Sequence, residues 1–421
     1  MRLLNTKFLG LCGVLIMTAP SAQASASADY ESVLPPPQVV REVMMALPQT
    51  RSQQLGQAHA GAKQAALNAG QHEWQLRLSQ ARRTELGGEQ LRDKEISLER
   101  GIRWFGKAKK DQAIGEQQRQ IADLTYADGW HETGRQLLDN WFATLRAINT
   151  RQRWQEQVQL SQQLLAIADK RVKAGEAAQL ELLMADTEQK KTALQLEQAM
   201  LEEEQQKQEL ALSYPGLPAP AQTMLPIPQM PDGTPQSWLQ QMLDDNHEIE
   251  LAEAEAQLHK LEAERVAAER IPDPVIGIRA TSERSGQEKI LGISISIPLS
   301  GDLRRSEASS SLLRAQISTE KHQQIRIKVE REARRTIASY QQAYTLWQSA
   351  HAMLAQSQLQ LEKMIKAYQL GEASLSDTLQ LRKTALDALT ATQSAQIDAL
   401  YTHARLALDS HALWGMEQAI E

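Results

Sequence analysis

Histidine, cysteine and paired acidic residues are the side chains that most often carry chemistry, and this sequence does not group them. No two of the nine histidines stand four residues apart, the spacing that places two imidazoles on one helix face for a metal ion. His72, His131 and His247 each precede a glutamate directly, and adjacent residues on a helix do not face each other. We find no nucleophile elbow, P-loop or dinucleotide-binding motif. The sequence therefore predicts neither an enzyme nor a protein with a resident metal ion or cofactor.

Two acidic residues occupy matching places after two glycine turns. Glu181 belongs to the stretch GEAAQLELL at 175–183, and Asp377 belongs to GEASLSDTL at 371–379, about 196 residues later. A period this long indicates a duplicated half rather than a short repeat. Carboxylates gathered around a symmetry axis would form a ring that attracts cations. At the start of a helix they would instead complement the helix dipole, and the sequence leaves both interpretations open.

Long helices must position these turns. Apolar residues recur at spacings of three and four, and no proline occurs between residues 107 and 213 or after residue 298. Only 4% of residues are aromatic, which also suits long helices. The pattern predicts helices at 39–69, 107–170, 237–269 and 302–368. It also predicts one helix after each glycine turn, and these two helices end near residues 212 and 413. Gly175 and Gly371 supply turn conformations that other residues rarely adopt.

Four short segments alternate apolar and polar residues, as strands with two unlike faces do. They form two predicted hairpins, at 72–105 and 274–299. The apolar parity, which we predict to share one face, comprises Trp74, Leu76, Leu78, Trp104, Ile276, Ile278, Leu291, Ile293, Ile295 and Ile297. The polar parity includes Arg279, Glu283, Ser294 and Ser296. Arg100 breaks the pattern because it falls on the apolar parity.

The ends and the middle of the chain differ from the rest in composition. Residues 1–24 have a basic start, an apolar run of about 12 residues that contains Cys12, and an Ala-Gln-Ala cleavage site, so they read as a signal peptide. Residues 214–235 hold seven of the 15 prolines and form a connector. We therefore expect a first repeat at 25–213, a second at 236–413 and a tail at 414–421. The net charge of -6 argues against a nucleic-acid partner.

Four strands of about ten residues could cross a bilayer, but they could not close a barrel, and lipid does not tolerate open sheet edges. Two copies would supply eight strands and three would supply twelve. The small residues Gly277, Gly292, Ser294 and Ser296 favour a lumen and therefore three copies. The predicted fold is mainly α with a transmembrane β-barrel of 12 strands shared by a homotrimer and continued by a coiled-coil α-barrel. The apolar parity would face outer-membrane lipid and the polar parity the lumen, with Trp74 and Trp104 near the interface.

Three features resemble the TolC-like outer-membrane efflux protein family: Pro-Asp-Pro at 272–274, LGISISIPL at 291–299 and the two Gly-Glu-Ala turns. The second hairpin is most similar to the subgroup that serves cobalt–zinc–cadmium type metal pumps. The resemblance implies a homotrimeric exit duct in the outer membrane of a Gram-negative bacterium, joined by a periplasmic adaptor to an inner-membrane transporter. It implies that the helical tips are the entrance and the adaptor-docking site, formed by Gly175, Glu176, Ala177, Glu181, Gly371, Glu372, Ala373 and Asp377.

Other functions fit parts of the same pattern. The same duct could serve drug efflux or protein secretion instead of heavy-metal cations, because a passive conduit does not choose its cargo. A soluble sandwich could use the same four strands, since sandwich strands alternate equally well. A soluble periplasmic coiled-coil adaptor would account for the helices but not for two amphipathic hairpins at a duplicated spacing.

Overall fold

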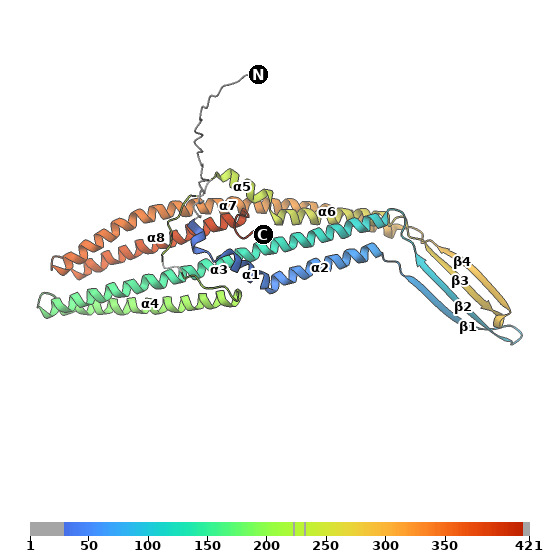
Figure 1. The fold of residues 1–421 in the computed structure, drawn as a ribbon, viewed down its shortest axis with the longest axis horizontal. Helices are drawn as coiled ribbons and strands as arrows, with labels where there is room; N and C mark the ends of the chain where they lie inside the picture. Colours follow the sequence, from blue (N-terminus) through green and yellow to red (C-terminus); the bar gives the residue numbers. More distant parts are fainter. Residues whose placement is uncertain (1–28, 222–223, 231–232, 416–421) are drawn as a thin grey trace, which may run out of the picture.

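The computed structural model describes residues 29–221, 224–230 and 233–415. The predicted signal peptide, with Cys12, and residues 416–421 of the predicted tail lie outside the described residues. Figure 1 shows an elongated molecule in which a helical body carries a sheet at one end and two helical hairpins end at the other. The predicted mainly helical fold with four strands is confirmed.

Two long helical hairpins make up most of the body. In the first, α3 (Lys107–Lys173) turns into α4 (Gln179–Ser213), and in the second, α7 (Asp302–Gln369) turns into α8 (Leu375–Asp409). The two long members have 67 and 68 residues, which corresponds to about 100 Å each at 1.5 Å per residue. The two short members have 35 residues each. The predicted helix to residue 413 ends earlier, at Asp409.

Four shorter helices extend along the half of the body nearer the sheet. They are α1 (Pro37–Ala46), α2 (Pro48–Ala69), α5 (Pro235–Asp244) and α6 (His247–Ala268), preceded by the short 3₁₀ helix η1 (Asp29–Val33). The predicted single helices at 39–69 and 237–269 are wrong, because each is broken in two. Leu47 is extended before Pro48, as the residue before a proline tends to be. Asn246 starts a new helix by accepting a hydrogen bond from the Ile249 amide at 3.0 Å.

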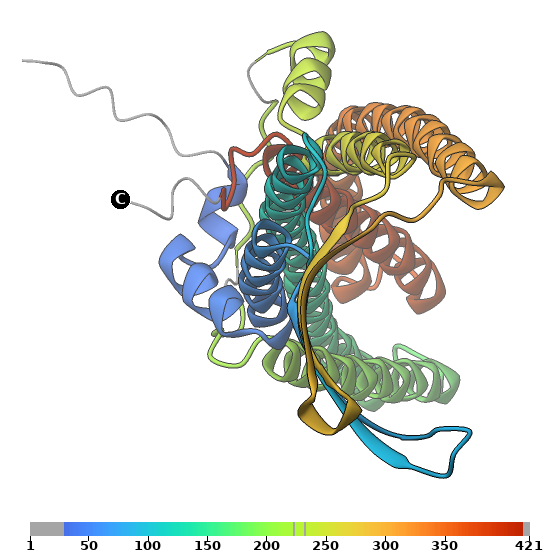
Figure 2. The ribbon, with the colours of Figure 1, turned by 90° about the vertical axis from the view of Figure 1, so that its right-hand side faces the viewer.

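The sheet joins the two halves of the chain. Strands β1 (Trp74–Thr84), β2 (Gln90–Gly101), β3 (Val275–Glu283) and β4 (Glu288–Ser296) are all antiparallel, in the order β1-β2-β3-β4. The short 3₁₀ turn η2 (Arg284–Gly286) links β3 to β4. Viewed from the sheet end, the strands follow a curve beside the helices (Figure 2). Since β2 pairs with β3, one continuous sheet is built from segments about 180 residues apart in the sequence.

The register aligns the alternating residues into rows across the sheet. One row is Trp74, Arg100, Ile276 and Ile295; the next is Leu76, Leu98, Ile278 and Ile293; the third is Leu78, Ile96, Ala280 and Leu291. Because successive side chains of a strand point to opposite faces, all three rows lie on the same face. We call it the apolar face. Residues one step away along each strand form the opposite, polar face.

The main hydrophobic core lies at the middle of the body, where α1, α3 and α8 meet. Its fully buried side chains include Met44 from α1, Leu137, Leu138, Phe142 and Leu145 from α3, and Leu400 from α8. The segment after α8 is also packed there, since Trp414 is buried and its carbonyl oxygen accepts a hydrogen bond from Trp130 Nε1 at 3.0 Å. This core fixes the two hairpins relative to each other.

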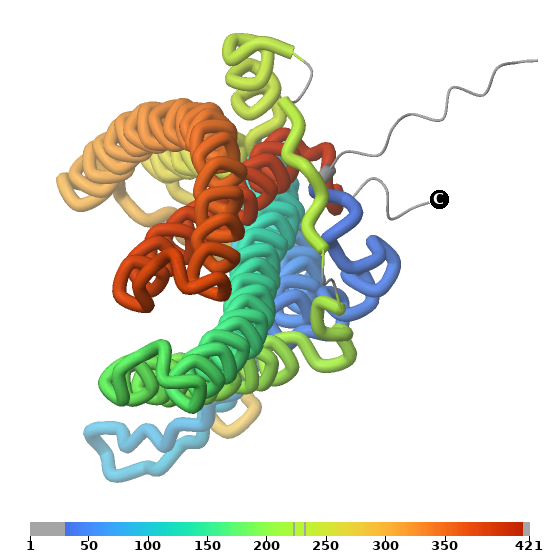
Figure 3. Tube along the Cα trace, turned by 90° about the vertical axis from the view of Figure 1, so that its left-hand side faces the viewer, coloured from blue at the N-terminus to red at the C-terminus, as the bar shows by residue number. Residues whose placement is uncertain are grey.

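The two hairpins run in the same general direction and end at the same end of the body (Figure 1), and the view from the helical tips shows them as two separate pairs rather than one closed bundle (Figure 3). Each hairpin packs mainly within itself, and α3 also packs along α6 and α8. In the part of the chain that the structure describes, none of the helices has a stretch long and apolar enough to span a membrane.

Candidate functional site

The apolar face of the sheet is not covered by any described part of the chain. All ten residues predicted for the apolar parity are exposed, from 38% for Trp104 to 84% for Leu291. Ile297 and Trp104 lie just beyond the ends of their strands. Sequence reasoning missed Phe105 and Leu299, which extend the same exposed apolar surface toward the helices and are more than 90% exposed. A contiguous apolar surface of this kind marks contact with another apolar phase or with another protein.

The polar face carries the predicted lumen residues. Arg279 and Ser294 lie on it, Ser296 lies at its end in β4, and Glu283 accepts a hydrogen bond from Arg83 Nη2 at 3.1 Å. The glycines on this face make room for longer neighbours. A Cβ at Gly277 would lie 2.7 Å from Glu99 Cγ, and one at Gly292 would lie 3.2 Å from Arg279 Nε. The small residues thus let polar side chains of adjacent strands lie flat against the sheet.

Both outer strands of the sheet have one unpaired edge. Among the described residues, β1 pairs only with β2 and β4 pairs only with β3. Each edge therefore presents a row of backbone N–H and C=O groups without strand partners. Such an edge is a template for pairing with another chain. In lipid, each unsatisfied group would cost several kcal/mol.

Asp273 connects the sheet to the helical body. It lies in the Pro-Asp-Pro motif before β3, and its side chain is only 7% exposed. It accepts hydrogen bonds from Lys107 Nζ at 2.7 Å and from the Trp104 backbone amide at 2.8 Å, and it pairs with His72 Nε2 at 2.8 Å. Burial raises the pKa of Asp273, but the bonds from His72, Lys107 and Trp104 outweigh it and lower the pKa to about 2. The carboxylate thus holds the ends of both hairpins of the sheet on α3.

A second carboxylate ties the helix ends together beneath the sheet. Asp111 of α3 accepts from Arg103 at 3.0 Å and from Arg265 of α6 at 2.5 Å. Arg103 also donates to two carbonyl oxygens in the last turn of α2, those of Leu67 and Asn68. Sequence reasoning missed this network because the partners are separated by up to 154 residues. The Pro-Asp-Pro motif marks Asp273 in the sequence, whereas no motif marks Asp111.

The helical tips have the same backbone geometry in both hairpins. Gly175 has φ 76° and Gly371 has φ 80°, in the left-handed region that favours glycine. The following amide reaches back five residues in both turns, from Glu176 to the Arg171 carbonyl and from Glu372 to the Ala367 carbonyl, each at 2.9 Å. This is the hydrogen bond of a Schellman motif. Ala177 and Ala373 follow in equivalent places before α4 and α8.

The two acidic residues after the tip turns make different contacts. Glu181 accepts a hydrogen bond from the Tyr368 hydroxyl at 3.2 Å and lies 3.8 Å from Arg171, whose guanidinium lies 4.7 Å from the centre of the Tyr368 ring. Asp377 instead accepts from its own helix cap, Ser374, whose hydroxyl is 2.7 Å away. Glu181 therefore links the two hairpins, whereas Asp377 is exposed and belongs to a capping arrangement.

Arginines continue the link between the hairpins along their length. Arg146 of α3 pairs with Asp398 of α8 at 2.7 Å, and Arg153 of α3 donates to Gln393 at 2.9 Å. Arg382 of α8, which is 3% exposed, pairs with Glu188 of α4 at 2.8 Å. No sequence pattern indicates these contacts, because each joins residues about 200 or more positions apart.

Three histidines from distant parts of the chain lie together at the middle of the body. The ring of His411 is 5.2 Å from that of His131 and 4.8 Å from that of His247. Burial lowers the pKa of His131 to about 4, so this imidazole is neutral at pH 7. Even so, no group of three or more histidine, cysteine, aspartate or glutamate residues suited to a metal ion occurs within the described ranges.

The fold is similar to that of several solved membrane channels. No protein-family model and no curated protein matches the sequence. The structure of CusC, described as forming a transmembrane channel, is 17% identical with a TM-score of 0.75, over 90% of this chain and 91% of that one. The outer-membrane channel OprN gives 15% identity and a TM-score of 0.75, over 90% of both chains. The Campylobacter jejuni outer-membrane channel CmeC is 14% identical with a TM-score of 0.73, over 98% of this chain and 94% of that one.

These similarities show the fold of this chain. It is the fold of outer-membrane channel proteins, in which the small sheet and the long helices described above recur along nearly the whole chain.

Proposed function

We propose that this protein is a passive outer-membrane exit duct of a tripartite efflux system in a Gram-negative bacterium. The main observation behind this proposal is that the sheet combines an exposed apolar face with two unpaired edges. Lipid would cover the face, and strands of identical copies would pair with the edges. In this proposal residues 1–24 are a signal peptide, and residues 25–213 and 236–413 are duplicated halves joined by the connector at 214–235.

Three copies account for the polar face better than two. Strand β4 of one copy would pair with β1 of the next, so that three sheets close a 12-stranded barrel. An eight-stranded barrel is filled by its own side chains. The polar face carries Arg279, Glu99 and the Arg83–Glu283 pair, which are long charged groups that favour a wider, water-filled interior. The number of copies in the purified complex tests this step directly, and we expect three.

The helical body would continue the barrel away from the membrane. Helices of about 100 Å are far longer than the roughly 30 Å hydrocarbon layer, so they would project into the periplasm. Their tips would form the entrance and dock a periplasmic adaptor, which in turn joins an inner-membrane transporter. The Arg171, Tyr368 and Glu181 contacts would hold the two hairpins together in the closed entrance. The exposed apolar sheet disfavours the alternative of a soluble adaptor.

Heavy-metal cations are the cargo that we propose, with drugs or secreted proteins as the alternative. The support is the resemblance of 270–274 and 292–299 to the metal-efflux subgroup, together with the exposed Asp377 at the tip. A deletion strain should lose tolerance to zinc, cadmium, cobalt or copper salts and regain it with the intact gene. Unchanged metal tolerance with lost tolerance to a drug would assign the duct to the alternative cargo.

A further inference from the structure

Arg100 is the single charged residue in the three rows of the apolar face. Its side chain lies between Trp74 of β1 and Ile276 of β3. Among the described residues, its Nε donates a hydrogen bond to the His72 carbonyl oxygen at 3.3 Å, and its guanidinium lies 5.3 Å from the centre of the Trp74 ring. Neither partner carries a negative charge. A guanidinium is always protonated, and on an apolar surface it needs a counter-charge.

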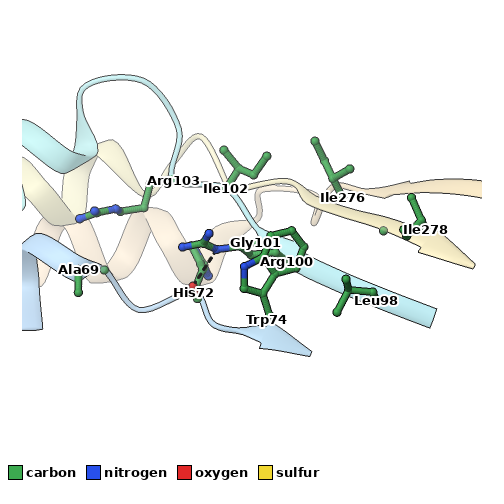
Figure 4. Close-up of a pocket in the computed structure, with 12 residues that line it drawn as sticks. Ala69, His72, Trp74, Leu98, Arg100, Gly101, Ile102, Arg103, Ile276 and Ile278 are labelled. Carbon is green, nitrogen blue, oxygen red and sulfur yellow. Dashed lines mark hydrogen bonds between the residues drawn. The ribbon is translucent and has the colours of Figure 1, made fainter. Parts of the chain in front are cut away.

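A cavity opens beside this guanidinium, at the end of the sheet nearest the helices (Figure 4). Its volume is about 440 Å³. Three basic side chains line it, those of Arg100, Arg103 and His72, and no acidic side chain of the described residues does. Arg103 is paired with Asp111 at 3.0 Å and His72 with Asp273 at 2.8 Å. Arg100 therefore supplies the positive charge that is not already neutralised.

The rest of the cavity wall is apolar. Figure 4 shows Trp74 beside Arg100, with Leu98, Ile276 and Ile278 further along the strands and Ile102 on the helical side. An inorganic anion would use only the basic end of such a site. A molecule with an anionic group and a hydrocarbon chain would use both ends, because the chain could lie along the exposed apolar rows.

We infer that this cavity binds the phosphate headgroup of a phospholipid in the leaflet on the helical side of the membrane. The inference rests on the proposed function, since it requires the apolar face to lie in lipid. The Arg100 guanidinium would donate two parallel hydrogen bonds to phosphate oxygens, the geometry that arginine and phosphate favour. One acyl chain would lie over Leu98 and Ile278.

The position of Arg100 along the strand fits the depth of a headgroup. It lies one residue from the end of β2, in the same row as Trp74 and four residues before Trp104. Tryptophans of transmembrane barrels concentrate at the two membrane interfaces. A bound phospholipid would therefore fix the depth of the sheet in the membrane. The interfacial tryptophans alone would define that depth less precisely.

Native mass spectrometry of the detergent-extracted protein tests this inference with phosphatidylglycerol as the probe. We expect the wild-type protein to retain one phospholipid per subunit and Arg100→Gln to retain about tenfold less, since glutamine lacks the positive charge and the paired charge-assisted hydrogen bonds to the phosphate. Arg100→Lys keeps the charge but loses the planar pair of donors, so the amount of phospholipid it retains should lie between those of the wild type and Arg100→Gln. Arg77→Gln removes an arginine from the polar face of β1 and should bind as the wild type does.

Two further probes identify the source of the phosphate. Diacylglycerol has the chains without the phosphate, and inorganic phosphate has the charge without the chains; we expect both to bind at least tenfold more weakly than phosphatidylglycerol. Equal binding of diacylglycerol, equal binding of inorganic phosphate, or equal phospholipid retention by Arg100→Gln would each overturn the inference.

Vesicle flotation separates failure of this inference from failure of the proposed function. Wild type and both Arg100 variants should float with vesicles of phosphatidylethanolamine and phosphatidylglycerol, because the remaining apolar face still enters lipid. A wild-type protein that stays in solution would overturn the membrane location itself. Flotation with unchanged phospholipid retention in Arg100→Gln would overturn only the headgroup site.

Discussion

Replacing Asp273 by alanine should destabilise the protein by about 3 kcal/mol and loosen the sheet from the helical body. Removing one partner of a buried ion pair leaves the other charge uncompensated, and such changes typically cost about 3–5 kcal/mol. The Lys107 side chain is 1% exposed and would keep only Glu269, at 2.9 Å, which places the expected effect at the lower end. Thermal unfolding of the purified protein, followed by its helical circular dichroism, measures the loss.

Asp302→Ala is the matched control, because that carboxylate is 91% exposed and, among the residues that the structure describes, its ion-pair partner is Arg305 on its own helix. Exposed pairs of this kind contribute little, so we expect a change within about 0.5 kcal/mol. An Asp273→Ala protein as stable as this control would contradict the role of Asp273 as the anchor of the sheet.

The same anchor should respond to acid. The pKa of Asp273 is lowered to about 2 in the folded protein, below the value of about 3.9 in an unfolded chain. Its stabilising contribution is therefore fully present above about pH 4 and is lost as the pH falls toward 2. Asp273→Asn should lack this part of the acid dependence, whereas the wild type should show it.

Lysine at Ile293 should prevent the protein from accumulating in the outer membrane. Ile293 is 78% exposed and lies in the middle row of the apolar face. A lysine on the lipid face of a barrel costs about 2–4 kcal/mol at the bilayer midplane and less toward the interface, and a trimer would carry three. We expect at least about a tenfold drop in the amount of assembled protein in the outer-membrane fraction, since 1.4 kcal/mol corresponds to a factor of ten.

Ser294→Lys provides the control on the next residue of the same strand. Its side chain lies on the polar face, where the proposed lumen would hydrate a new ammonium group. We expect normal assembly of this variant. Equal accumulation of the Ile293→Lys and Ser294→Lys proteins would contradict the proposal that the apolar face contacts lipid while the polar face contacts water.

The sheet could be predicted from sequence because its information is local. Alternation with a period of two assigns each residue of a strand to a face, and the structure places Ile276, Ile278, Ile293 and Ile295 together on one face. The long helices could also be predicted from sequence, since a proline-free stretch with a helical period of apolar residues indicates a helix without any tertiary context. The breaks at Pro48 and Asn246 were missed because their capping and turn signals are single residues within otherwise helical patterns.

Contacts between distant segments could not be predicted in the same way. Asp273 and Lys107 are 166 residues apart, and Glu181 and Tyr368 are 187 apart. No periodicity links such pairs, because their proximity depends on how the first and second halves of the chain pack against each other. The same holds for Arg100, whose place on the apolar parity was visible in the sequence while the cavity beside it depends on α2, β1, β2 and β3 together.

The number of subunits in the purified complex tests the central claim most directly. Multi-angle light scattering of the protein extracted in detergent, corrected for bound detergent, gives the protein mass of the complex. We expect three copies of the chain and a requirement for detergent to keep them in solution, because only shared sheets can close the barrel and lipid or detergent must cover its apolar face. A stable monomer in detergent-free buffer would contradict the duct, since its strands would then be satisfied without neighbours or membrane.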